Sequence, residues 1–424
     1  MLQTQYLRDN KDEVIQKLLK KNFHAKDIID SICLKDDRRK ETQNKLDEVL
    51  AQSNQLSKEI GQYFKLGEAQ KAQEAKQQTA QLKEQSKTLA QTLQQIQQEL
   101  LDLLTQLPNV PHDSVPHGKT PDDNEIVLES GSIPQLHKEA MPHWELAKKY
   151  NLIDFELGTK ITGAGFPVYK GKGARLQRAL INFFLDRNIA AGYQEIQPPH
   201  VVNQDSGFGT GQLPDKEGQM YHITEDNLYL IPTAEVPITN LFRDVILSSS
   251  DFPIKCTSYT PCFRREAGSY GKDVRGLNRL HQFDKVEIVQ IQHPDTSYQT
   301  LDKMVEHVSE LLNELELPYR ILKLCGGDMS FTSALTYDME VFSTAQQHWL
   351  EVSSISNFES FQANRLKLRF KDQNKKSVLC HTLNGSALAL PRIVAALLEN
   401  NQDEKGISIP SALVPYTGFN RIDS

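Results

Sequence analysis

The residues best suited to chemistry lie around two predicted strands, at residues 255–264 and 282–291. Arg264, Arg265 and Glu266 stand together at the end of the first strand, and Phe283 lies at the start of the second. The polar, glycine-containing segment between the strands predicts a hairpin with a long tip. A guanidinium group is shaped to hold phosphate oxygens, and an aromatic face can pack against a purine ring. The pattern predicts a nucleotide held on antiparallel strands, although an Arg-Arg-Glu triplet alone also fits a solvated surface patch.

Further candidate side chains lie in other predicted strands. Thr233 and Glu235 are two residues apart in a segment expected to be extended, which would point a hydroxyl and a carboxylate to one side. Glu287 would add a second carboxylate, on the same strand face as Phe283. Glu351, in a predicted strand at 349–354, can offer oxygen to a hard cation. Ordinary surface alternation or an edge-strand carboxylate would explain the same residues.

A long segment before these residues predicts a helical hairpin. Residues 27–103 contain no proline and are dominated by Gln, Lys, Glu, Ala and Leu, with Gly67 between two blocks of heptad-spaced apolar or small residues. Such spacing predicts two antiparallel helices paired as a coiled coil. A dimerisation coiled coil or a spacer is the alternative. The heptad positions are Leu46, Val49, Ser53, Leu56, Ile60 and Tyr63, then Ala72, Ala75, Thr79, Leu82, Ser86, Leu89, Leu93, Ile96, Leu100 and Leu103.

The rest of the chain predicts a small helical start, a linker and a mixed body. Residues 1–26 predict a helical start that buries Leu7, Val14, Leu18 and Leu19. Prolines between 107 and 121 exclude a regular helix and predict a linker. Within the body, an amphipathic helix at 174–191 is expected to bury Leu176, Leu180, Phe183, Phe184 and Ile189. Further helices are predicted at 142–150, 301–315 and 393–399, and further strands at 193–199, 319–324 and 336–342.

Composition limits the classes of function. A chain of 424 residues has room for one large domain and one smaller domain. Its net charge of -7 does not indicate a nonspecific nucleic-acid binder, so any RNA contact must be local. No stretch is apolar enough to span a membrane, and a cytoplasmic protein is expected. The five cysteines form no Cys-x-x-Cys pair, so neither a disulfide framework nor a zinc site is expected.

Three segments resemble the motifs of a known family. The sequence CFRRE at 262–266, the loop with Gly268, Gly271 and Gly276, and the sequence HQF at 281–283 resemble motif 2 of the class II aminoacyl-tRNA synthetases, in the form found in seryl-tRNA synthetases. The predicted helix and strand at 174–199 resemble motif 1, which implies a homodimer. Residues 381–392 resemble motif 3.

The resemblance implies an α+β fold. It consists of a long N-terminal antiparallel coiled-coil hairpin and a class II catalytic domain, built on a mixed, mainly antiparallel sheet flanked by helices. The implied domains are a tRNA-binding domain at 1–106 with its arm at 27–103, a proline-rich linker at 107–124, and the catalytic domain at 125–424. Members of the family activate serine with ATP and transfer it to tRNA(Ser), and to tRNA(Sec) where one exists.

The resemblance also implies roles for individual residues. Arg264 and Arg392 would be catalytic, and Glu351 with Ser354 would hold Mg²⁺ against ATP. The implied ATP-binding residues are Arg264, Arg265, Glu266, Phe283, Glu351, Val352, Ser353, Ser354 and Arg392. The implied serine-binding residues are Thr233, Ala234, Glu235, Arg264, Glu287, Asn384 and Ser386. Two alternatives remain: a related enzyme that loads an amino acid onto a carrier protein, and a non-enzymatic RNA-binding or coiled-coil scaffold.

Overall fold

The structure, a computed structural model, describes residues 1–266 and 275–423. It divides into two compact units. One contains residues 1–19 and 23–108, and the other contains residues 20–22 and the chain from 109 onward. No helix of the described residues is long and apolar enough to cross a membrane.

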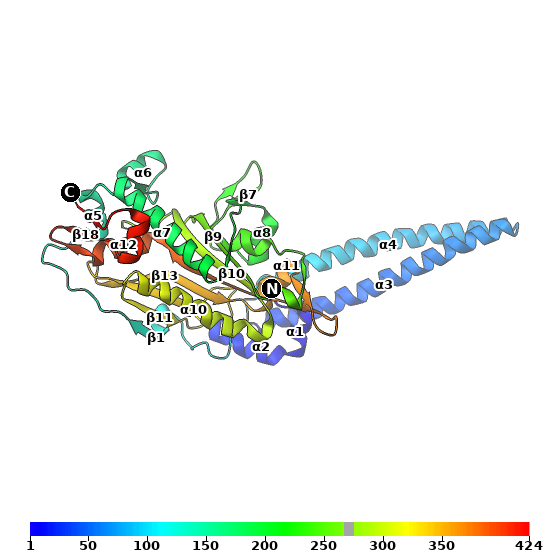
Figure 1. The fold of residues 1–424 in the computed structure, drawn as a ribbon. Coiled ribbons are helices and arrows are strands. Elements are labelled where there is room, and N and C mark those ends of the chain that lie inside the picture. Colours follow the sequence, from blue (N-terminus) through cyan, green and yellow to red (C-terminus); the bar gives the residue numbers. More distant parts are fainter. Residues whose placement is uncertain (267–274, 424) are drawn as a thin grey trace. The chain divides into compact units, whose positions relative to one another are not determined.

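The first unit is a helical hairpin with a small helical start, and it confirms the heptad prediction. Its helices are α1 (Thr4–Asp9), α2 (Lys11–Leu18), α3 (Lys26–Lys65) and α4 (Ala69–Leu104). The helices α3 and α4 pack against each other along their length and are joined by a turn at Gly67, which has a positive φ of 75° (Figure 1). Heptad residues buried between them include Leu46, Val49, Ala72, Ala75, Leu93 and Leu100.

The helical start differs from expectation at one residue. Leu7, Val14 and Leu18 are buried as predicted, but Leu19 is 39% exposed. Leu18 is the last residue of α2, so the helical spacing that would turn Leu19 inward ends there.

The second unit is built on an eight-stranded sheet. Each pair of neighbouring strands is antiparallel except β4 and β9, which are parallel. The order across the sheet is β1 (Glu125–Ser130), β11 (Tyr319–Lys323), β12 (Leu335–Ser343), β13 (His348–Asn357), β16 (His381–Ala389), β10 (Gln282–Gln292), β9 (Ile254–Phe263) and β4 (Gln194–Glu195). The predicted strand at 193–199 is therefore only two residues long, because Pro198 and Pro199 cannot donate to a ladder.

The two strands of the predicted hairpin are β9 and β10, which pair from Phe263 with Gln282 to Ile254 with Ile291. Gly276 is described, whereas Gly268 and Gly271 lie outside the described residues.

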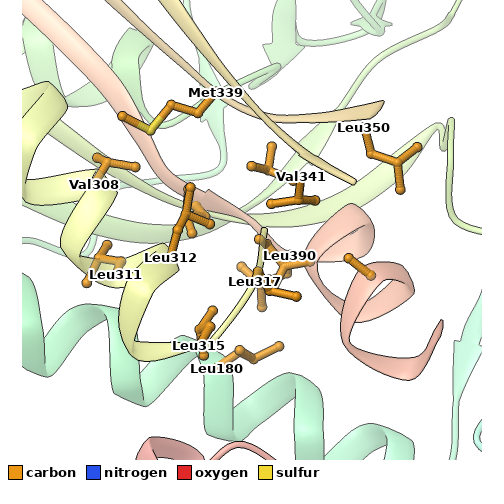
Figure 2. Packing of buried hydrophobic residues seen from close by; sticks show 14 of the residues in the cluster. Leu180, Val308, Leu311, Leu312, Leu315, Leu317, Met339, Val341, Leu350 and Leu390 are labelled. Carbon is orange, nitrogen blue, oxygen red and sulfur yellow. The ribbon is translucent and has the colours of Figure 1, made fainter. Parts of the chain in front are cut away.

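Three helices cover one face of the sheet: α7 (Gly171–Ala190), α10 (Ser297–Glu314) and α12 (Leu390–Asn400). Figure 2 shows Leu180 of α7, Leu312 of α10 and Leu390 of α12 in one cluster with Met339 and Val341 of β12. Because successive side chains of a strand point to opposite faces, polar residues between these apolar ones lie on the other face.

The helix α7 also differs from expectation at one position. Ile189, expected to be buried, is 44% exposed. It is the penultimate residue of α7, where the helix extends past the apolar core.

Short elements complete the second unit. The remaining helices are α5 (His143–Lys149), α6 (Phe155–Ile161), α8 (Gln204–Thr210), α9 (Glu235–Asn240), α11 (Ser360–Leu366) and α13 (Val414–Thr417). The remaining strands form small sheets: β2 (Ile153–Asp154) with β3 (Val168–Tyr169); β5 (Val201–Val202), β7 (Leu228–Leu230) and β6 (His222–Ile223); β15 (Ser377–Leu379), β14 (Arg369–Lys371) and β8 (Ile246–Ser248); and β17 (Gln402–Asp403), β18 (Gly406–Ser408) and β19 (Arg421–Ile422).

Candidate active site

Arg264 lies directly after β9 and is held over an aromatic ring. Its backbone N–H donates to the carbonyl oxygen of His281 at 2.9 Å, which keeps it in register with the segment entering β10. Its Nε donates to the carbonyl oxygen of Pro232 at 3.3 Å. Its guanidinium carbon lies 5.3 Å from the centre of the Phe283 ring. The predicted pair of a cation and an aromatic face is therefore assembled at the end of this hairpin.

The next two residues turn away from the strand. The backbone N–H of Arg265 donates to the carbonyl oxygen of Gln219 at 2.9 Å. Glu266 has a positive φ of 49°, and its carboxylate forms an ion pair with Arg279 at 3.0 Å. The structure therefore places Glu266 at the site's edge with its charge already paired.

Thr233 and Glu235 meet Glu287, but not by the predicted route. The segment is not extended through both residues: Ala234 has helical dihedral angles and Glu235 is the first residue of α9. The Thr233 hydroxyl donates to Glu287 Oε2 at 3.3 Å, and the Glu235 backbone N–H donates to Thr233 Oγ1 at 3.3 Å. The hydroxyl and the two carboxylates therefore come together as expected, but through the turn into the helix and not through the alternation of a strand.

Two partners of these carboxylates were missed by the sequence analysis. Lys285 forms a buried ion pair with Glu287, and Gln362 Nε2 donates to Glu235 Oε1 at 2.6 Å. Burial and the nearby charge of Glu287 raise the pKa of Glu235 to about 7. A signal for Lys285 exists in the sequence, because a lysine two residues before Glu287 in an apolar strand must share its face.

Asn384 and Ser386 reach the same pocket from β16. Ser386 lies directly opposite Glu287 in the ladder between β10 and β16, and Asn384 lies opposite Val289. Two residues apart, the two side chains share one face of the sheet. The Asn384 amide is close enough to Glu235 to oppose the rise in the pKa of that carboxyl that burial causes.

A β-bulge places Glu351 and Ser354 on one face of the sheet. Three residues apart, they would point to opposite faces of a regular strand. On β12, Asp338 and Glu340 are two residues apart and share a face. Ser354 lies opposite Asp338, and Glu351 lies opposite Glu340, so Val352 is the extra residue of a bulge. The bulge therefore turns both oxygen donors to the side away from the leucine core.

Ser353, next to the bulge, joins β13 to the pocket strand. Its hydroxyl donates to the carbonyl oxygen of Ser386 at 2.6 Å. The strands that hold the oxygen donors and the carboxylate pocket are therefore tied together by a side chain as well as by their ladder.

Arg392 approaches the oxygen donors from the first turn of α12. The helix begins at Leu390, three residues before the predicted start, so Arg392 is its third residue. Arg392 Nε donates to the carbonyl oxygen of Asn278 at 3.0 Å, and its Nη1 donates to the carbonyl oxygen of Glu351 at 2.7 Å. Its guanidinium also lies 3.8 Å from the Glu351 carboxylate.

These groups have complementary chemistry. A guanidinium over an aromatic ring, a second guanidinium and a pair of oxygen donors can hold a nucleotide polyphosphate with a hard cation. The buried carboxylates and hydroxyls can hold a small molecule with an ammonium group and a polar side chain.

Comparison with known proteins places this chain in the class II aminoacyl-tRNA synthetases. Residues 220–401 match the model of the tRNA synthetase class II core domain (G, H, P, S and T). Residues 1–111 match the model of the seryl-tRNA synthetase N-terminal domain.

Similar proteins narrow the class to one family. The chain is 51% identical over its whole length to a serine–tRNA ligase of Salinibacter ruber, with 99% of that protein covered. It is 45% identical to a serine–tRNA ligase of Chlorobaculum parvum, with both chains fully covered. A seryl-tRNA synthetase of Pyrococcus horikoshii, solved with ATP, superposes with a TM-score of 0.88 at 31% identity, covering 100% of this chain and 99% of that one. The chain belongs to the seryl-tRNA synthetase family, and its function is that of a serine–tRNA ligase.

The buried Glu235 predicts a pH-dependent stability. Its pKa is 4.5 as a free side chain and about 7 in the folded protein, so the folded state binds the extra proton between these values. The stability due to this group is therefore fully present below about pH 4.5 and falls as the pH rises toward 7. We therefore subtract the unfolding free energy of the parent protein from that of Glu235→Gln at each pH. This difference should increase by roughly 1–3 kcal/mol from pH 5 to pH 7.5, measured by urea denaturation without ligands.

Glu84→Gln is the matched control, because Glu84 is exposed on α4. Its difference from the parent protein should not change with pH. A difference for Glu235→Gln that is equally constant would contradict the assigned burial of charge.

Proposed function

We propose that this chain activates L-serine with ATP to form seryl-adenylate and diphosphate, and then transfers the seryl group to tRNA(Ser). The observation on which the proposal depends is the pocket in which Glu235 and Glu287 lie beside Thr233, the residue after the Pro232 that Arg264 contacts. Pro232, whose carbonyl oxygen accepts from Arg264, is the residue before Thr233.

The first step requires no general base, because the carboxylate of serine is itself the nucleophile. Positioning and charge neutralisation then supply the catalysis. Arg264 holds the α-phosphate and neutralises the charge that grows on it as the serine oxygen attacks. Phe283 stacks on the adenine, and Glu266 and Arg265 contact the nucleotide from the turn. Arg392 binds the terminal phosphate and the departing diphosphate.

A magnesium ion fits the residues at the bulge. Glu351 and Ser354 present a carboxylate and a hydroxyl on one face of β13, which is the oxygen chemistry that Mg²⁺ prefers. Mg²⁺ usually completes its shell with phosphate oxygens and water, and it would neutralise phosphate charge there. Val352 and Ser353 provide the backbone that sets the spacing of the two ligands. No zinc is expected, and that expectation stays a prediction.

The charges of the pocket match a substrate ammonium group. Two carboxylates, Glu235 and Glu287, face one lysine, Lys285, so the ionised pocket has one uncompensated negative charge. An ammonium ion supplies the missing positive charge and favours the ionised form of Glu235. Asn384 and Ser386 then lie near the substrate, with Ala234 at the pocket wall.

The pocket also explains how serine is selected. A buried site that hydrogen-bonds a hydroxyl rejects an analogue without it by roughly 10⁴-fold, because its polar groups are left unpaired. This excludes alanine. The exclusion of threonine requires that the pocket leave no room for its methyl group.

The RNA partner is assigned to the N-terminal hairpin. We propose that α3 and α4 hold tRNA(Ser), and tRNA(Sec) in a cell that has one, because a long exposed hairpin offers a surface for an RNA helix. The family match of residues 1–111 favours this partner over a carrier protein, which has no use for such an arm. The match of residues 220–401 to the class II core domain disfavours a non-enzymatic scaffold.

Other features of the family complete the proposal. The helix α7 and strand β4, which correspond to motif 1, would form the interface of a homodimer. The domain limits at 1–106, 107–124 and 125–424 and the cytoplasmic location stay predictions.

Removing the arginine at the end of β9 tests the first step. Arg264→Ala should lower kcat for serine-dependent exchange of diphosphate into ATP by about 10²–10³-fold, because one donor aimed at developing charge contributes about that much. The control Arg38→Ala removes an exposed arginine of α3 and should leave exchange unchanged. A rate within twofold of the parent protein for Arg264→Ala would remove this residue from the mechanism.

Shortening the arm separates the two steps. Residues 55 and 78 lie at similar distances from the turn at Gly67, so deletion of residues 55–78 with a short glycine link leaves the lower part of α3 and α4 paired. We expect serine-dependent exchange to persist and charging of tRNA(Ser) to fall by at least 10²-fold, as an RNA contact surface is lost. Exchange measured in the same variant is the folding control. Unchanged charging would contradict the assignment of the arm.

A further inference from the structure

We propose that His143 is a positioning residue for Arg392, to which it is connected through Glu399, Gln346 and Asn278; this inference rests on the proposed function. His143 lies on α5, far from the nucleotide residues in sequence, and nothing in its sequence context indicated a role. The connection consists of hydrogen bonds between side chains and backbone that are buried or half-buried.

The imidazole of His143 joins two parts of the fold. The backbone N–H of Leu277 donates to His143 Nε2 at 2.8 Å, so Nε2 has no proton. The proton must then be on Nδ1, which donates to Glu399 Oε1 at 2.7 Å. Both side chains are 0% exposed. A neutral imidazole in this tautomer therefore links the segment after residue 274 to helix α12.

Glu399 receives several donors at once. Besides His143, its carboxylate accepts from Gln346 Nε2 at 2.8 Å and from the hydroxyl of Ser343. Burial alone would raise the pKa of Glu399, but the hydrogen bonds from the His143 side chain, the Ser343 hydroxyl and the His143 backbone N–H together hold the pKa below its usual value. The carboxylate thus stays ionised and keeps all of its donors in place.

Gln346 connects Glu399 to Asn278, which in turn binds Arg392. Asn278 Nδ2 donates to Gln346 Oε1 at 2.8 Å, and the carbonyl oxygen of Asn278 accepts from Arg392 Nε at 3.0 Å. The dipeptide of Leu277 and Asn278 is consequently held twice, by the imidazole at one residue and by the amide at the next. Its carbonyl oxygen is one of two backbone acceptors that orient the guanidinium of Arg392.

The close approach of the chain to His143 is an independent sign of this arrangement. Gly276 has a φ of 67°, and a Cβ atom added there would lie 2.2 Å from His143 Nε2. Only glycine allows the backbone to pass the imidazole so closely that the next N–H can reach it. Sequence and fold are therefore both adapted to this contact.

A pair of substitutions distinguishes the roles of the two imidazole nitrogen atoms. His143→Gln can keep an acceptor near the Nε2 position, facing Leu277, whereas His143→Asn can keep only a group near the Nδ1 position, facing Glu399. We expect kcat for serine-dependent exchange to fall about tenfold in His143→Asn and less than about threefold in His143→Gln, with KM for serine within about twofold in both. Equal activity of the two variants, or a change confined to KM for serine, would overturn the proposal.

Gln346→Met decides the question if the buried histidine variants do not fold. Methionine keeps the shape of the half-buried glutamine and removes all of its side-chain hydrogen bonds, and Gln347→Met is the control at the exposed neighbouring residue. We expect Gln346→Met to lower kcat about fivefold to tenfold in the parent protein but to have no further effect in an Arg392→Ala background, because coupled residues are not additive.

The outcomes distinguish this inference from the function it rests on. An equal loss in both backgrounds, or no loss in an active parent protein, would overturn the role of the connection. A folded parent protein without serine-dependent exchange would instead overturn the proposed function.

Discussion

Two buried carboxylates facing one buried lysine impose the constraint on which the catalytic unit depends. Glu235 and Glu287 are 9% and 2% exposed, and Lys285 is 6% exposed. Buried charges destabilise a fold unless partners compensate them, so the site must supply donors from several elements. Gln362 of α11 and Thr233 before α9 meet this need. The same incompletely compensated charge makes the pocket suitable for an ammonium group.

The two faces of the sheet have different roles, because one packs in the hydrophobic core and the other carries the polar side chains. Met339 and Val341 of β12 point into the leucine core, whereas Asp338 and Glu340 between and beside them point away. A single strand can serve both purposes only because its side chains alternate. The bulge at Val352 is the local exception, and it gives one face two oxygen donors that regular geometry would separate.

Local patterns in the sequence predicted the parts of the structure that depend on local spacing. The heptads on either side of Gly67 identified α3 and α4, and the two predicted strands that flank a polar, glycine-containing loop correspond to β9 and β10. The motif residues came from resemblance rather than from geometry. Their convergence on one face became visible only in the structure.

What the sequence did not predict depends on contacts between distant segments. Helix α9 starts at Glu235 where an extended segment was expected, and Gln362 reaches that residue from α11, more than 120 residues later. The bulge at Val352 leaves no local signature, because it is defined by its partner strand β12. His143 acts through Glu399 of α12 and through Leu277, neither of which is near it in sequence.

The most direct test of the account is amino-acid-dependent exchange of diphosphate into ATP by the full-length protein without tRNA, with serine, threonine and alanine in parallel. The account predicts exchange with serine and at least about 10³-fold lower kcat/KM with alanine, because the hydroxyl partners in the pocket would be unpaired. Comparable exchange with alanine, or none with serine, would contradict the claim that this buried pocket selects serine.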